Sequence, residues 1–95
     1  DERIVKVKKP DYLGRSQWML KYSGQSFLAS IEDLEWLHRF QSGQVALQPG
    51  DSLRVRMHVE VYYGENMEVV HVTHSVRRVI EVVHPPLVTQ SQITF

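Results

Sequence analysis

Residues 52–83 read SLRVRMHVEVYYGENMEVVHVTHSVRRVIEVV, and this stretch decides the fold. Between residues 52 and 63 apolar and polar side chains alternate, and a period of two is typical of a strand with one buried face. A second run, rich in valine, begins at Val69. It follows a break at Gly64-Glu65, where glycine can supply the positive φ of a two-residue turn. The stretch therefore predicts one long antiparallel hairpin.

The expected loop at Gly64-Glu65 also predicts the register of this hairpin, because a slip of one residue would turn every side chain to the other face. At Arg77-Arg78 the alternation fails, which predicts a bulge or bend. The predicted inner face is mostly apolar, with the pairs Val61 and Glu68, Val59 and Val70, Met57 and Val72, Val55 and His74, and Leu53 and Val76. The predicted outer face is polar and partly cationic, with the pairs Glu60 and Val69, His58 and His71, Arg56 and Thr73, and Arg54 and Ser75.

Two further strand patterns precede the long hairpin. Residues 3–9 alternate valines with lysines, as a short half-buried strand does. Residues 17–29 suggest a second hairpin around Ser23-Gly24, with Trp18 opposite Ala29. In this register Trp18 is expected in the core, and a stacking platform for a base or a sugar is the alternative.

Residues 31–42 carry the one convincing helical pattern. Ser30 is the expected N-cap and Gly43 the expected stop. Trp36 lies beside the apolar stripe and either completes the core or anchors a partner at the rim. Because so short a helix cannot bury its stripe alone, it is expected to close one end or face of the sheet. The stripe recurs at three-residue steps and consists of Ile31, Leu34, Leu37 and Phe40.

These elements predict an α+β domain. A short strand at residues 44–47 and a type II turn at residues 48–51 are expected to lead into the long hairpin. The predicted fold is a small antiparallel β-barrel or curved sheet of five or six strands with one α-helix at about residues 31–42, and a two-sheet sandwich is the alternative. Residues 1–84 are expected to form a single β-rich domain. The uncharged residues 85–95 are expected to be a flexible tail or linker, or else an added edge strand.

Composition restricts the function. Lys plus Arg and Asp plus Glu each number 11, so the chain lacks the excess positive charge of proteins that bind chiefly to phosphate backbones. The absence of cysteine excludes a disulfide framework and a thiolate nucleophile, and it favours a cytoplasmic location. The chain does not begin with Met, which predicts a module of a larger intracellular protein.

Candidate binding residues lie on the outer face of the hairpin and on the first strand. The lysines of that strand either protect a sheet edge from self-association or contact phosphates. His58 and His71, with Glu60 nearby, have the donors of a zinc site, but Arg56 beside them would oppose a cation, so neither a metal nor a cofactor is predicted. The candidate residues for binding a protein or a nucleic acid are Arg54, Arg56, His58, His71, Arg77, Arg78, Lys6 and Lys8.

The sequence favours a binding function over catalysis. It contains none of the phosphate-loop, zinc-protease or nucleophile-elbow motifs, so an enzyme is not predicted. The preferred function is a non-catalytic accessory module that binds a protein partner, or a neighbouring domain of the same chain, through residues 52–83. One alternative is a nucleic-acid-binding module that uses a basic strip on the sheet, and the other is a fragment of an enzyme. No apolar run is long enough for a membrane span, so a membrane is not an expected partner.

Overall fold

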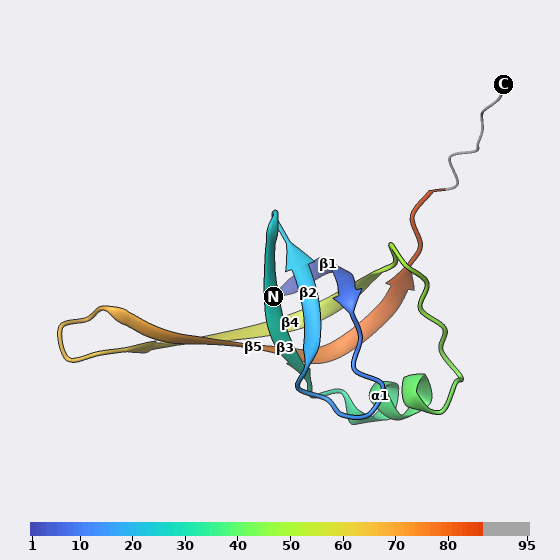
Figure 1. Ribbon diagram of the computed structural model, residues 1–95, viewed down its shortest axis with the longest axis horizontal. Coiled ribbons are helices and arrows are strands. Elements are labelled where there is room, and N and C mark those ends of the chain that lie inside the picture. Colours follow the sequence, from blue (N-terminus) through green and yellow to red (C-terminus); the bar gives the residue numbers. More distant parts are fainter. Residues whose placement is uncertain (87–95) are drawn as a thin grey trace, which may run out of the picture.

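The computed structural model describes residues 1–86, which form five strands and one helix. The strands close into a barrel in the order β1-β2-β3-β5-β4 (Figure 1). The predicted small barrel with one helix is therefore confirmed, and it is not a sandwich. Residues 87–95, most of the expected tail, lie outside the described residues. The elements are β1 (Glu2–Lys9), β2 (Trp18–Tyr22), β3 (Gln25–Ile31), α1 (Leu34–Gln41), β4 (Ser52–Tyr63) and β5 (Val69–Val83).

The hairpin of β2 and β3 has the predicted register, with Trp18 opposite Ala29. Its two-residue loop places Ser23 at φ 51° and Gly24 at φ 79°. Positive φ at both central residues is the geometry of a type I′ turn, which matches the twist of the two strands.

One strand pair is parallel, whereas the sequence predicted an antiparallel sheet. Ser30 and Ile31 of β3 pair with Ser75 and Val76 of β5 in the same direction. Parallel neighbours need a long crossover, and here α1 and β4 lie between the two strands in the sequence. This pair closes the barrel.

The helix is shorter than predicted, and its N-cap is Asp33 rather than Ser30. The Asp33 carboxylate accepts a hydrogen bond from the backbone N–H of Trp36 at 3.2 Å. The Ser30 prediction was wrong because residues 30 and 31 are extended for pairing with β5. Gly43 follows the helix at φ 88°, as expected of the residue that ends it.

The strand predicted at residues 44–47 is also wrong. β4 already has β1 and β5 on its two sides, and a closed barrel offers no further edge. Val45 and Leu47 pack instead as half-buried residues against the core. The turn at residues 48–51 is confirmed, with Gly50 at φ 94° and the N–H of Asp51 donating to the carbonyl of Gln48 at 3.0 Å.

The long hairpin exists, but its loop and register differ from the prediction. The loop spans residues 64–68, and the N–H of Gly64 donates to the carbonyl of Glu68 at 2.8 Å. Met57 consequently pairs with Val76 instead of Val72. At Met57 the register is displaced by four residues, 76 − 72, and the bulges raise the displacement to six at Leu53, 82 − 76. The alternation along β4 itself keeps its side chains on their predicted faces. The predicted bulge at Arg77-Arg78 is confirmed, because Arg77 is the additional residue between the pairs Arg56 with Arg78 and Met57 with Val76.

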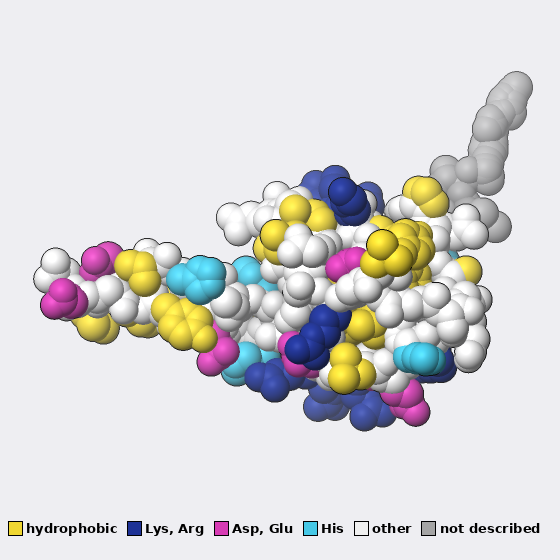
Figure 2. All heavy atoms as spheres, turned by 60° about the horizontal axis from the view of Figure 1, so that its bottom comes forward, with side chains coloured by type: hydrophobic (Ala, Val, Ile, Leu, Met, Phe, Trp, Pro, Cys, Tyr) yellow, Lys and Arg dark blue, Asp and Glu magenta, His cyan; other side chains and the backbone are white. Residues whose placement is uncertain are grey.

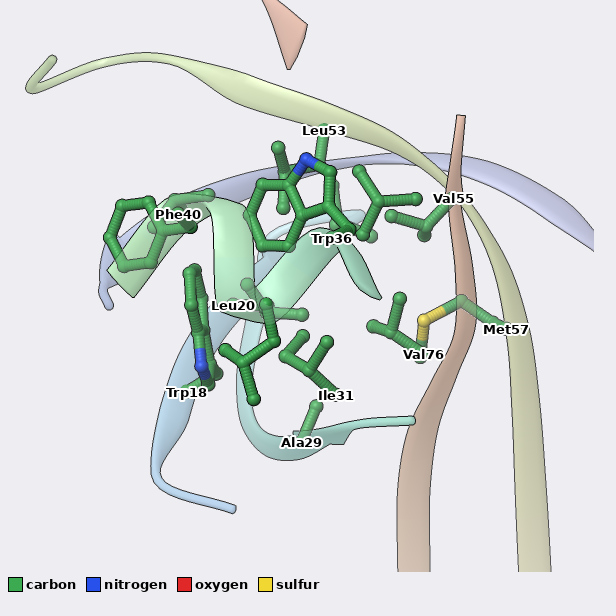
Figure 3. Close-up of a cluster of buried hydrophobic side chains, with 14 residues drawn as sticks. Trp18, Leu20, Ala29, Ile31, Trp36, Phe40, Leu53, Val55, Met57 and Val76 are labelled. Atoms are coloured by element: carbon green, nitrogen blue, oxygen red, sulfur yellow. The ribbon is translucent and has the colours of Figure 1, made fainter. Parts of the chain in front are cut away.

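The core lies inside the barrel, and α1 covers one end of it (Figures 1 and 3). Trp18 is fully buried, with its ring centroid 5.7 Å from that of Trp36 and 5.1 Å from that of Phe40. Trp36 is 4% exposed, so it completes the core and is not a rim anchor. The predicted core position of Trp18 is confirmed.

Candidate functional site

The hairpin of β4 and β5 extends beyond the barrel as a two-stranded ribbon (Figure 1). β1 pairs with β4 no further than Arg56, and β3 pairs with β5 no further than Ser75. Met57 still exchanges backbone hydrogen bonds with Asp1. Within residues 1–86, the parts of β4 and β5 between residues 58 and 74 pair only with each other. Residues 58–74 are termed the arm. The arm makes the molecule elongated, with extents of 60 × 31 × 21 Å.

One face of the arm is a continuation of the barrel core. Met57 and Val76 form the last cross-strand pair that is fully buried, with exposures of 4% and 0%. The next pairs on the same face become steadily more exposed, from half-buried Val59 with His74 to Val61 with Val72 at 40% each. At the far end, Tyr63 with Val69 are 55% and 58% exposed. The inward-facing pattern thus runs on past the strands that would cover it. Figure 2 shows hydrophobic, His and acidic side chains along the arm.

The opposite face of the arm is polar. Tyr62 lies opposite His71, with ring centroids 5.7 Å apart. Glu60 pairs with Thr73, and its carboxylate lies 3.9 Å from Nε2 of His58. The ribbon is therefore amphipathic, with an apolar face and a polar face.

At the barrel end next to the arm, the side chains of Arg3, Tyr22, Phe27 and His74 form a cluster, which is termed the mouth. The guanidinium of Arg3 lies 4.9 Å from the ring centroid of Tyr22, and the ring of Phe27 stacks on that of His74 with centroids 4.2 Å apart. Burial, together with the positive charge of Arg3, lowers the pKa of His74. Val59 lies opposite His74 across the hairpin, and the guanidinium of Arg3 is ion-paired with the carboxylate of Asp1 at 3.0 Å.

The mouth was not predicted from the sequence, although the alternation of side chains along β1 and β2 indicates it. Arg3 is in phase with Val5 and Val7, so its side chain is on the inner side of β1, and it pairs across the sheet with buried Val55. Tyr22 is likewise in phase with Leu20 and Trp18. An extension of the alternation to the ends of these strands would have placed both residues at the barrel mouth.

The predicted basic strip is interrupted by carboxylates. Nε of Arg54 lies 2.7 Å from the carboxylate of Glu81, and its NH1 lies 3.3 Å from that of Glu2. The hydrogen bonds that Arg54 donates to the carboxylates of Glu2 and Glu81 raise the pKa of Arg54 above its usual value. Arg56 and Arg78 lie directly opposite each other, beside an open hollow that Glu2 also lines.

The other candidates are separated from this arginine pair. Arg77 is exposed at the bulge, and Lys6, also exposed, lies opposite Lys21 on β2. Lys8 is exposed near the other end of β1.

The predicted opposition of His58 and His71 is wrong because of the displaced register. His58 lies opposite Ser75, and His71 lies opposite Tyr62. Among residues 1–86, no group of three or more His, Asp and Glu side chains is arranged to hold a metal ion.

Comparison of the chain with protein-family models, with curated proteins and with solved structures gave no match. In the part of the chain that the structure describes, no helix has the length and apolar character needed to cross a membrane. Function must therefore be argued from the arm and the mouth themselves.

Proposed function

We propose that this chain is a non-catalytic binding module whose arm docks its apolar face on a protein partner or on a neighbouring domain of the same chain. The observation that supports this proposal is the inner face of β4 and β5, which continues past the barrel and is uncovered within residues 1–86. A two-stranded ribbon is only marginally stable alone in water. A partner that covers this face would stabilise the arm and remove apolar surface from water.

Burial of the exposed side chains would contribute favourably to the free energy of binding. Full burial of a Val side chain contributes about 1.5–3 kcal/mol, so half of that at Val61, Val69 and Val72 gives about 2–5 kcal/mol. Tyr and Met are enriched at the centres of protein interfaces, and Tyr63 and Met67 are 55% and 72% exposed. The polar opposite face can remain in water when the apolar face is docked.

The test compares two adjacent residues of β5 whose side chains point to opposite faces of the arm. A photo-crosslinking amino acid replaces either Val72 on the apolar face or Thr73 on the polar face. Crosslinked partners are identified by mass spectrometry and purified. Their affinity is then measured for the unaltered chain and for the variants Val72→Asp and Thr73→Asp.

Crosslinking is expected from position 72 in preference to position 73. Val72→Asp should weaken binding by at least about 10-fold, or about 1.4 kcal/mol, because docking would bury an unpaired charge. Thr73→Asp, the matched control, should stay within about 3-fold of the unaltered chain. Both variants lie outside the barrel, so their thermal unfolding midpoints should agree. Equal crosslinking from both faces, or equal loss of affinity in both variants, would exclude docking through the apolar face.

A further inference from the structure

We infer that the free edge of β4 in the arm, at residues 58–62, binds an extended strand of the partner protein, which pairs antiparallel to β4 and in line with β1. This inference rests on the proposed function, because the strand belongs to the partner that docks on the arm. It adds the conformation of the partner segment, the edge of the arm that it uses and its direction.

The ladder between β1 and β4 is regular up to the base of the arm. The N–H of Met57 donates to the carbonyl of Asp1 at 2.7 Å, and the amino group of Asp1 donates to the carbonyl of Met57 at 3.1 Å. Two residues that exchange both bonds form a hydrogen-bonded pair of an antiparallel ladder. The pairs from Lys6 with Ser52 to Glu2 with Arg56 contain no bulge. The backbone groups of Met57 therefore face the side of β4 on which β1 lies.

Beyond Met57 the same edge of β4 carries backbone groups that no strand pairs with. Successive residues of a strand direct their backbone groups to alternate sides, so the N–H and C=O groups of Val59 and Val61 point to the side on which Met57 binds Asp1. Residues 57–62 pair with β5 without a register shift, which preserves this alternation. Within residues 1–86, only β5 pairs with this part of β4. The groups of Val59 and Val61 are therefore in phase for a further strand.

The free edge of β4 is not protected by the sequence. Exposed edge strands are usually very short, or they carry prolines, lysines or bulges that prevent pairing with another chain. Residues 58–62 read HVEVY, without proline or lysine, and the first register shift past Met57 comes only after Tyr62. A regular edge of this kind is suited to strand addition, in which backbone hydrogen bonds provide affinity and alternate side chains provide specificity.

The two faces of the arm determine which strands fit. A strand in line with β1 places every second side chain beside Val59 and Val61, on the apolar face of the arm. Val61 is 40% exposed, so apolar side chains at these positions would remove that surface from water. The intervening side chains would lie beside His58 and Glu60 on the polar face. A fitting partner strand therefore alternates apolar and polar residues.

The opposite edge of the arm is less suited to a strand. On β5 the carbonyl of Val76 accepts from the N–H of Glu32 at 2.8 Å, so this edge faces β3. β3 pairs with β5 only at Ser30 and Ile31. The ladder of β3 thus diverges from β5 before the arm begins, whereas the ladder of β1 is regular up to the arm.

The test compares two proline variants of one cross-strand pair. Val61→Pro removes an N–H from the β4 edge and places a ring there, and Val72→Pro, the matched control, does the same on the β5 edge. Val61 and Val72 lie opposite each other on the apolar face, and each is 40% exposed. Proline is tolerated at edge positions whose N–H faces solvent. Both variants should therefore retain the fold, and their circular dichroism spectra should agree.

The probe is a phage-displayed library of random linear peptides, selected on the unaltered chain. The selected peptides should alternate apolar and polar residues. Their affinity, measured by fluorescence anisotropy, should fall by at least about 10-fold in Val61→Pro and stay within about 3-fold in Val72→Pro. Hydrogen exchange of the unaltered chain is followed by NMR. A bound peptide should slow the exchange of the Val59 and Val61 amides and leave that of Val72 unchanged, because only the β4 edge becomes hydrogen-bonded.

Three outcomes would overturn the inference: no selected peptide with a dissociation constant below about 100 µM, equal loss of affinity in the two proline variants, or exchange at Val59 and Val61 that no peptide slows. Slow exchange of both amides in the unbound chain would also overturn it, because the edge would already be occupied. The exchange measurement needs no variant, so it remains decisive if Val61→Pro impairs folding of the arm. A partner that crosslinks through position 72 but binds both proline variants equally removes the strand contact and leaves the proposed function intact.

Discussion

At the scale of single residues, Asp33 links two parts of the fold. One carboxylate oxygen accepts from the N–H of Trp36 in the first turn of α1 at 3.2 Å. The other accepts from the N–H of Val79 in β5 at 3.0 Å. This side chain thus caps the helix and attaches it to the strand that closes the barrel.

We expect Asp33→Ala to lower the free energy of unfolding by about 1.5–5 kcal/mol. Loss of an N-cap costs about 0.5–2 kcal/mol, and the N–H of Val79, a residue 7% exposed, loses its acceptor, which costs about 1–3 kcal/mol more. Urea denaturation measures the change. Asp33→Asn keeps one oxygen and should lose less than Asp33→Ala, and equal stabilities of the two variants would contradict the double role.

His74 should make the stability of the fold depend on pH. Burial and the charge of Arg3 lower its pKa from the usual value of 6.5, so the unfolded chain takes up this proton at a higher pH than the folded chain. The stabilisation is complete above about pH 6.5 and is lost as the pH falls through the lowered pKa. Urea midpoints between about pH 7.5 and pH 5 should fall for the unaltered chain and fall less for His74→Gln. Parallel curves would show that His74 does not contribute.

At the scale of elements, the two hairpins differ in how far the sequence predicts them. Ser23-Gly24 forms a tight two-residue loop, so the register of β2 and β3 follows from the loop position alone. In the long hairpin the loop includes Met67 at φ 64°, a conformation that is uncommon for a residue with a side chain. Nothing in the sequence marks Met67 for it, and the predicted loop was consequently too short.

The bulges in β5 also displaced the strand pairing from the predicted register. β5 has 15 residues and β4 has 12, and the difference of three equals the number of register shifts between them. The sequence indicated the bulge at Arg77 because the alternation fails there. The bulge at Ile80 leaves no comparable signal, since Val79 and Val82 are both apolar and both face the core side.

The start of α1 depended on contacts that are distant in the sequence. Ser30 and Asp33 are both good capping residues, and local preference does not choose between them. Pairing of residues 30 and 31 with β5, more than 40 residues away, keeps this segment extended and moves the helix start to Leu34. The alternation of the strands, which is local, was sufficient to predict the barrel. The apolar stripe correctly placed Leu37 and Phe40 in the core, but the prediction was wrong for Leu34, which is 55% exposed.

At the scale of the whole molecule, the sequence predicted that the hairpin of residues 52–83 binds a partner, and it directed attention to the outer cationic face of that hairpin. The exposed apolar face depends on where β1 and β3 stop covering β4 and β5. That is a property of the barrel topology, because Val59, Val61 and Val72 have the same pattern as the buried Val55. No local pattern in the sequence separates the covered valines from the uncovered ones.

The distribution of charge over the molecule argues against nucleic acid as the partner. Arg54 is held by Glu2 and Glu81, and the arm carries acidic residues at its tip. Phosphate-driven binding is sequence-independent and weakens steeply with salt, with non-specific dissociation constants of about 10⁻⁴–10⁻⁶ M. A chain of formal net charge zero, whose central arginine is already paired, should bind more weakly than this range.

We therefore expect fluorescent single-stranded and duplex oligonucleotides to show no binding at protein concentrations up to about 100 µM at low salt. The decisive comparison uses the double variant Arg56→Ala and Arg78→Ala, which removes the arginine pair on the outer face, beside Arg39→Ala on α1 as the control. If the outer face did bind phosphate, the unaltered chain would bind with a steep salt dependence. The slope would then fall by about 0.7–0.9 for each phosphate that the double variant no longer neutralises, and it would be unchanged in the control. That result would replace the apolar arm with the arginine pair as the functional surface, because a protein interface made by buried valines is only weakly screened by salt.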